Sequence, residues 1–175
     1  ADYVSFVPAT GCSSFVGRIG GKQIINLADG CDAGSTIHEI GHALGLWHEQ
    51  SRSDRDAFLI VNWANISDGM AYNFNTFVES RSDGVNIGSF DFGSIMLYGS
   101  YYFSRNGLPT LTRRDGTTFA ANRSVLSAGD RSAVAVMYSP VLPFRNVSSG
   151  ASTGDWDYCR GKATCQPGQR ITGMS

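Results

Sequence analysis

Three histidines fall within eleven residues of this chain, and the chain has no others. His38 and His42 are four residues apart, so on a helix they share one face and can present two imidazoles to a single metal ion. Glu39 follows His38, at a position from which its carboxylate can reach a metal-bound water without ligating the metal. Helical histidines are otherwise solvated or satisfied by hydrogen bonds. This spacing therefore favours a metal-binding helix.

The residues that follow the pair extend the pattern to a third ligand. His48 lies ten residues after His38, and on an unbroken helix it would point about 80° away from it. Gly45 can adopt a positive φ and end the helix, which lets His48 approach the same ion. Three neutral nitrogens plus a water are typical of catalytic zinc, whereas structural zinc has four protein ligands. The sequence predicts one catalytic Zn²⁺ bound by these histidines.

The expected chemistry is hydrolysis. Zinc lowers the pKa of its bound water towards ~7 and polarises a scissile carbonyl. We expect Glu39 to act as the general base, which takes the water's proton and passes it to the leaving amine. A tyrosine hydroxyl near the metal is expected to stabilise the developing oxyanion. A Ser–His–Asp system is not available, because every histidine is assigned to the metal.

Composition narrows the class of protein further. The 175 residues carry 14 Lys and Arg against 15 Asp and Glu, a net charge of −1, so there is no basic excess for nucleic acid or an anionic membrane. No run of 18 apolar residues is present, and we expect no membrane span. Three Trp, seven Tyr and ten Phe are ample for the core of one domain.

Four cysteines form two clusters along the chain. The even count and the clustering suggest two local bridges, Cys12–Cys31 and Cys159–Cys165. Four cysteines nevertheless allow three connectivities, and free buried thiols are the alternative. The absence of C-x-x-C argues against a thioredoxin-like motif or a thiolate zinc site. Bridges indicate an oxidising compartment, and hence a secreted protein.

Local patterns predict few regular elements outside the histidine region. Gly20-Gly21-Lys22 is a turn signal between two strand-like segments, which predicts a hairpin. Asp32 or Ser35 is expected to cap the metal-binding helix, and Ser127 to cap a later one with Asp130 in a capping-box variant. The expected elements are a strand at 3–8, a hairpin of 14–19 with 23–27, and helices at 35–47 and 128–137.

Two motifs together resemble a known family. Residues 38–48 followed by Glu49 resemble the metzincin zinc motif in its astacin form, in which a Glu follows the third His. Residues 94–98, Ser-Ile-Met-Leu-Tyr, resemble the Met-turn of that family. The resemblance implies that Met96 forms the floor of the site. It also implies that Tyr98 is the switching tyrosine, which binds zinc in the free enzyme and swings to stabilise the oxyanion.

Other segments extend the resemblance over residues 3–138. Residues 11–17 resemble the edge strand that pairs antiparallel with extended substrate, residues 51–56 a charged structural segment, and residues 126–138 the C-terminal helix. The family fold implied is α+β and zincin-like, with a twisted sheet and the active-site helix over an irregular lower lobe. The expected organisation of the single domain 1–175 is an upper lobe at 1–48, a lower lobe at 49–140 and an irregular tail at 141–175.

The family also suggests how the protein is made and what it cleaves. The resemblance implies a secreted zinc endopeptidase that acts on proteins or peptides and is made as a zymogen, with its own pro-segment as inhibitor. Family members bury an activated N-terminus against the Glu after the third His. We expect this chain to lack the family's N-terminal segment, so Ala1 is not assigned that role and Glu49 is left to another partner.

Specificity and two alternatives stay open on the sequence. The family places the primed-side pocket partly at residues 100–112, where the candidates are Tyr101, Tyr102, Phe103 and Arg105. Another metzincin branch would have the same chemistry, although other branches generally lack the Glu and Tyr found here. The alternative from another class is a catalytically incompetent fragment that binds zinc or peptides. The intact Glu39 argues against that fragment, and the expected lack of the family's N-terminal segment argues for it.

Overall fold

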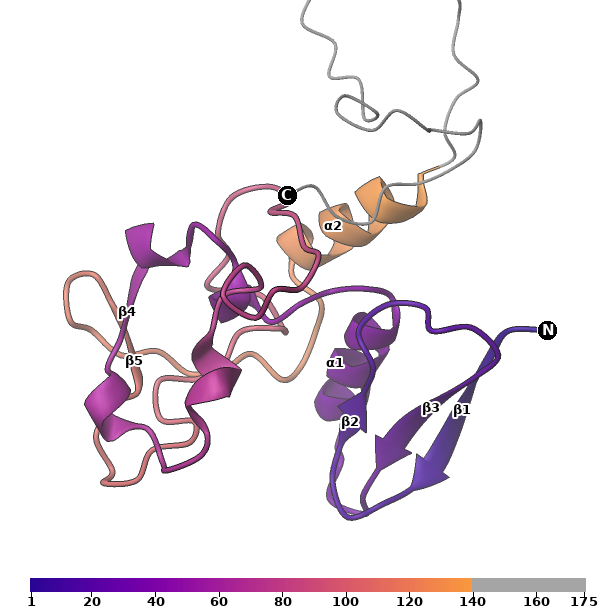
Figure 1. Cartoon of the computed structure of the whole chain (residues 1–175), viewed down its shortest axis with the longest axis horizontal. Helices are drawn as coiled ribbons and strands as arrows, with labels where there is room; N and C mark the ends of the chain where they lie inside the picture. Colours follow the sequence, from indigo (N-terminus) through magenta and orange to yellow (C-terminus); the bar gives the residue numbers. More distant parts are fainter. Residues whose placement is uncertain (140–175) are drawn as a thin grey trace, which may run out of the picture.

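A computed structural model describes residues 1–139 of the chain. The expected tail at 141–175 and the expected Cys159–Cys165 bridge lie outside these residues. Figure 1 shows β1, β2 and β3 beside α1, with β4 and β5 in a separate, loop-rich part and α2 near the middle. The helices and strands are β1 (Tyr3–Pro8), β2 (Ser13–Ser14), β3 (Lys22–Leu27), α1 (Ala33–Ala43), β4 (Leu59–Val61), β5 (Leu111–Arg113) and α2 (Ala128–Tyr138).

The first three strands form one sheet in the order β1-β3-β2. The strand expected at 3–8 is confirmed as β1, and it pairs parallel with β3. The hairpin of 14–19 with 23–27 is confirmed only in part: its second strand is present as β3, but the tight turn at Gly20-Gly21-Lys22 does not join two long strands. β2 does pair antiparallel with β3, but it spans two residues only, Ser13 opposite Asn26 and Ser14 opposite Ile25. The chain leaves the sheet between Ser14 and Lys22.

Hydrogen bonds outside the ladder explain why the long first strand of that hairpin does not form. The side chain of Gln23 donates to the carbonyl of Gly17 at 2.9 Å and accepts from the amide of Ile19 at 3.2 Å. The amide of Gly17 in turn donates to the carbonyl of His42 in α1, at 2.8 Å. These bonds hold residues 15–21 as a loop against the end of the helix, and they satisfy backbone groups that a hairpin would pair across the strands.

Helix α1 confirms the expected helix with different bounds. Asp32 is the N-cap, and its side chain accepts from the amide of Ser35 at 2.7 Å, so the helix begins two residues earlier than predicted. The helix ends at Ala43, because Gly45 adopts φ +104° and turns the chain, as its position predicted. α1 packs against β2 and β3. None of the helices within residues 1–139 is long and apolar enough to cross a membrane.

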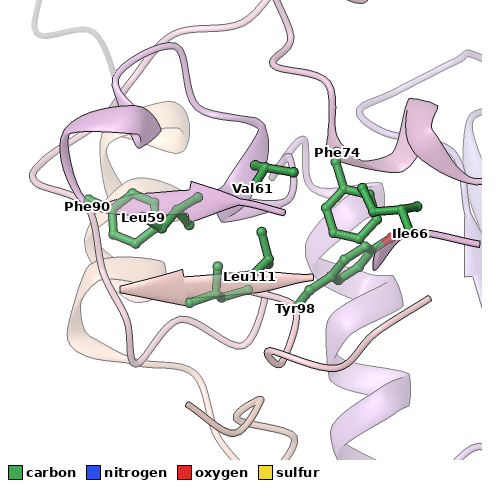
Figure 2. Close-up of a cluster of buried hydrophobic side chains, with 8 residues drawn as sticks. Leu59, Val61, Ile66, Phe74, Phe90, Tyr98 and Leu111 are labelled. Atoms are coloured by element: carbon green, nitrogen blue, oxygen red, sulfur yellow. The ribbon is translucent and has the colours of Figure 1, made fainter. Parts of the chain in front are cut away.

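Two apolar clusters form the core. The larger cluster lies in the loop-rich part, where Leu59 and Val61 of β4 face Leu111 of β5 and the ring of Tyr98 lies beside that of Phe74 (Figure 2). The smaller cluster joins the Met-turn to the helices, and its buried members are Leu46, Ile95 and Met96. The Met-turn thus contributes to both clusters, and it connects the helical part to the loop-rich part.

The Cys12–Cys31 bridge is present, as expected, and it closes a loop with a sequence separation of 19. It joins the residue before β2 to the residue before the cap of α1. Cross-linking a loop of this length mainly reduces the entropy of the unfolded chain, so replacing both cysteines by serine is expected to lower the free energy of unfolding by about 3 kcal/mol. Urea unfolding of the double variant and the parent measures this loss. An unchanged unfolding midpoint would contradict it.

Candidate metal centre

The three histidines converge on one point. His38 and His42 lie one turn apart on α1, and His48 returns to them after the bend at Gly45. The Nε2 atom of His48 lies 3.2 Å from the Nε2 atoms of both His38 and His42. The ligand atoms of all three lie within 4.8 Å of one another, as the sequence predicted.

Backbone carbonyls set the protonation of two of the rings. Nδ1 of His38 lies 2.8 Å from the carbonyl oxygen of Ile95, and Nδ1 of His42 lies 2.8 Å from that of Leu46. A carbonyl oxygen only accepts, so each Nδ1 carries the proton and each Nε2 keeps its lone pair. Hydrogen bonds of this kind orient metal-binding imidazoles. The two Nε2 atoms are therefore available to a metal ion.

Burial keeps the rings neutral. It lowers the pKa of His38 from 6.5 to about 4, with a further lowering from the neighbouring His42. Burial also lowers the pKa of His42, and it lowers the pKa of His48 well below 6.5. Three converging lone pairs repel one another unless a cation lies between them. The donor set therefore fits zinc, with the fourth position left to a water or a substrate.

Glu39 has the environment expected of a general base. It is 6% exposed, and its Oε2 atom is buried without a hydrogen-bond partner among residues 1–139. Burial raises the pKa of Glu39 from 4.5 to about 7, while the charge of Arg123 lowers it. The carboxylate lines the same cleft as the three histidines and is available to a water or a substrate there.

The Met-turn lies against the metal-binding helix. Met96 is 1% exposed, and a Cβ placed on Gly41 of α1 would lie 2.8 Å from its sulfur, so any larger residue at position 41 would require the Met96 side chain to shift. The ring of Tyr98 lies 4.5 Å from that of His48. Met96 therefore packs against the helix, and Tyr98 lies beside the third histidine.

Glu49 contacts residues other than Ala1, as expected. Its Oε1 atom accepts from the amide of Asp91 at 2.8 Å and lies 3.7 Å from the guanidinium of Arg52. Burial raises the pKa of Glu49 to about 7, and the Asp91 amide and Arg52 partly oppose that rise. The exposed Ala1 takes no part in these contacts.

The cleft beside the histidines has a volume of about 420 Å³. β2 contributes Ser13 and Ser14 to its wall. Tyr102 and Phe103, two of the four residues expected near the primed-side pocket, also line it. Tyr101 and Arg105 do not. The cleft is lined by Cys12, Ser13, Ser14, Ser35, His38, Glu39, His42, His48, Asn73, Tyr98, Tyr102, Phe103 and Arg123.

Two residues of the site were missed by sequence reasoning. Arg123 lines the cleft, and its guanidinium donates to the carbonyls of Ile95 and Leu97 in the Met-turn. Asp130 was predicted only as part of a helix cap, yet its carboxylate also accepts from Ser94 Oγ at 2.6 Å and from the amide of Ile95 at 2.9 Å. No local pattern in the sequence indicates that Arg123 belongs to the site. The capping box does predict the position of Asp130, but it does not predict the hydrogen bonds of Asp130 to the Met-turn.

Several known proteins are similar in sequence to this chain. The model of the astacin peptidase family matches residues 1–139. Zinc metalloproteinase nas-13 of Caenorhabditis elegans is 40% identical over 139 residues, which cover 79% of this chain and 31% of that protein. Blastula protease 10 of Paracentrotus lividus is 47% identical over 115 residues, or 65% of this chain and 19% of that protein. This chain thus spans less than a third of these relatives.

A solved structure supports the same assignment. High choriolytic enzyme 1 of the medaka fish Oryzias latipes, a hatching enzyme zinc-protease, superposes with a TM-score of 0.71 and is 38% identical. The match covers 78% of this chain and 68% of that one. The fold is accordingly the α+β metzincin fold that was expected, with the zinc-binding triad on α1 and the turn after it. This chain belongs to the astacin family of peptidases.

Proposed function

We propose that this chain is the catalytic part of a zinc-dependent endopeptidase that hydrolyses peptide bonds in proteins and peptides. One observation supports the proposal above the others. Three neutral imidazole nitrogens converge beside a buried carboxylate that has no partner among the described residues, and all four line one cleft. When bound by His38, His42 and His48, zinc supplies Lewis-acid polarisation of the carbonyl and of a water.

Glu39 moves the proton in this reaction. Its carboxylate accepts a proton from the attacking water and delivers it to the leaving amine. Without metal, burial raises the pKa of Glu39 to about 7. A zinc ion bound by the neighbouring histidines would lower it and so favour the carboxylate, which is the form that accepts the water's proton. The neighbouring histidines keep their roles as ligands, because burial keeps them neutral.

Tyr98 stabilises the developing negative charge. Within residues 1–139 its hydroxyl makes no hydrogen bond that would have to break first, and its side chain lines the cleft. Burial raises the pKa of Tyr98 to about 12, so the hydroxyl stays protonated and can donate to an oxyanion. This supports the role that the family resemblance implied for it.

The substrate lies as an extended strand along β2. Ser13 and Ser14 pair with β3 on one side only, and both residues line the cleft. An unpaired strand edge can hydrogen-bond to the backbone of any extended peptide, which explains binding with little dependence on sequence. Tyr102, which also lines the cleft, would then contact a substrate side chain.

We further propose that the protein is secreted, that it is made as an inactive precursor and that it has two lobes. The Cys12–Cys31 bridge supports a secreted protein, as does membership of a family whose proteins are typically secreted. A pro-segment of the precursor would act as the inhibitor before activation. The expected division into an upper lobe at 1–48 and a lower lobe at 49–140 fits the position of the histidines, with the cleft between them.

Metal removal tests the function. The parent chain is assayed on a mixed quenched-peptide library, then stripped with a zinc chelator, dialysed and given one equivalent of Zn²⁺. We expect cleavage to fall to background on stripping and to return on addition, while a sample dialysed without chelator keeps its activity. Cleavage that survives complete zinc removal would contradict the proposal. One bound zinc without any cleavage would favour the incompetent binding fragment instead.

A further inference from the structure

Phe103 has a backbone conformation that bulky residues rarely adopt. Within residues 1–139 only Phe103 and Arg81 have a positive φ without being glycine, at +56° and +53°. Arg81 lies in an exposed turn away from the cleft, but Phe103 lines the cleft. A left-handed conformation costs free energy in a residue with a large side chain, so it persists only where the surrounding structure imposes it.

Backbone hydrogen bonds at Phe103 and just after it impose this conformation. The carbonyl of Phe103 accepts from the amide of Ser67 at 2.8 Å, and the amide of Arg105 donates to the carbonyl of Asn65 at 2.9 Å. Between these two bonds, Ser104 forms an isolated antiparallel bridge with Ile66. The segment around Phe103 is therefore held against residues 65–67, and the direction of its side chain is set by the backbone.

The ring held in this way contacts Tyr98. The ring centroids of Phe103 and Tyr98 are 5.6 Å apart, and Phe74 lies 5.9 Å from Tyr98 and 6.2 Å from Phe103. Phe74 is fully buried and forms the inner side of this cluster, where it lies beside Tyr98 in Figure 2. Phe103 is 37% exposed and forms the side that faces the cleft. His48 contacts the same tyrosine ring at 4.5 Å.

We propose that Phe103 is a positioning residue that orients Tyr98 beside the metal-binding histidines, an inference that rests on the proposed function. The left-handed backbone directs the Phe103 ring against Tyr98, and Phe74 supports the tyrosine from the core. Tilted and edge-to-face aromatic contacts favour particular ring orientations, so losing one ring leaves Tyr98 with more orientations than the productive one. Phe103 acts through Tyr98 and not through the substrate.

A double-mutant cycle tests this dependence. In the zinc-loaded parent, Phe103→Leu is expected to lower kcat about tenfold with KM within about twofold, since misplacing one catalytic group costs this much or more. Phe103→Tyr keeps the ring and is expected to restore kcat. In a Tyr98→Phe background, Phe103→Leu should change kcat by less than about twofold. An equal loss in both backgrounds, or a rise in KM at constant kcat, would overturn the proposal.

A second variant and a second measurement make the test independent of activity. Phe103→Gly also removes the ring but adopts a positive φ without strain, so it serves if the leucine variant folds poorly. In ¹³C-tyrosine-labelled, metal-free protein, the Tyr98 signal is assigned by its loss in Tyr98→Phe. We expect one sharp ring signal in the parent, and split or broadened signals in both ring-less variants. An unchanged single signal overturns the positioning role, even if the parent fails to cleave peptides.

Discussion

Replacing Glu39 by Gln is expected to lower kcat by roughly 10²–10⁴-fold while the protein still binds one zinc per chain. Glutamine has the same shape but cannot accept the proton. No described group hydrogen-bonds to the buried Oε2 atom of Glu39, so no neighbouring group is in position to act as the base instead. The zinc ligands should be unaffected, because the carbonyls of Ile95 and Leu46, and not Glu39, orient His38 and His42. Steady-state kinetics with zinc analysis by atomic absorption measures both quantities.

The chain offers a matched control for this substitution. It has three glutamates, and Glu79 lies outside the cleft, where it accepts from the amide and the hydroxyl of Thr76. Glu79→Gln removes one negative charge as Glu39→Gln does, and its kcat is expected to equal that of the parent. If Glu39→Gln with a full complement of zinc kept more than about a tenth of the parent's kcat, Glu39 would not be the general base.

Replacing Asp130 by Ala is expected to lower the free energy of unfolding by about 3–5 kcal/mol, the largest stability loss among these substitutions. The carboxylate is 5% exposed and accepts hydrogen bonds from Ser94 Oγ, from the amide of Ile95 and from the amide of Ser127. Without it these donors stay buried without a partner, and α2 loses its capping box. Urea unfolding of the zinc-free variant and parent measures the loss.

A second substitution separates the two roles of Asp130. Ser127→Ala removes the other half of the capping box, the hydroxyl that accepts from the amide of Asp130, and leaves the bonds to the Met-turn intact. Its expected cost is about 1 kcal/mol. Because Ile95 also orients His38, Asp130→Ala is further expected to weaken zinc binding about tenfold, whereas Ser127→Ala should not. Equal effects of the two variants would show that Asp130 is only a helix cap.

Local sequence predicted those parts of the site that depend on neighbouring residues. Spacing along one helix brings His38 and His42 to the same face, and Gly45 turns the chain so that His48 can join them. The cap at Asp32 and the capping box of α2 also act within four residues. In each case the partners are close in sequence, so the residue types and their spacing are enough to infer the contact.

Several features needed contacts between distant parts of the chain. The long first strand of the predicted hairpin does not form, because the carbonyl of His42 in α1 accepts from the amide of Gly17. The partners of Glu49, the position of Arg123 and the tie between Asp130 and the Met-turn each join residues that no local pattern relates. The same holds for Phe103, whose left-handed φ is imposed by a segment more than thirty residues earlier.

The sequence by itself determined the three metal ligands, the position of Glu39, which we propose as the general base, and the helix that carries them. It did so because 3.6 residues per turn and one glycine bend relate these side chains geometrically, whatever surrounds them. Only the tertiary structure decided how Tyr98 lies against His48, how Asp130 binds the Met-turn and how Phe103 packs on Tyr98, and which groups in the cleft are buried. Those outcomes depend on packing and on the pairing of buried polar groups across the whole fold. Few of these contacts can be predicted from a short stretch of sequence, because their partners lie far apart along the chain.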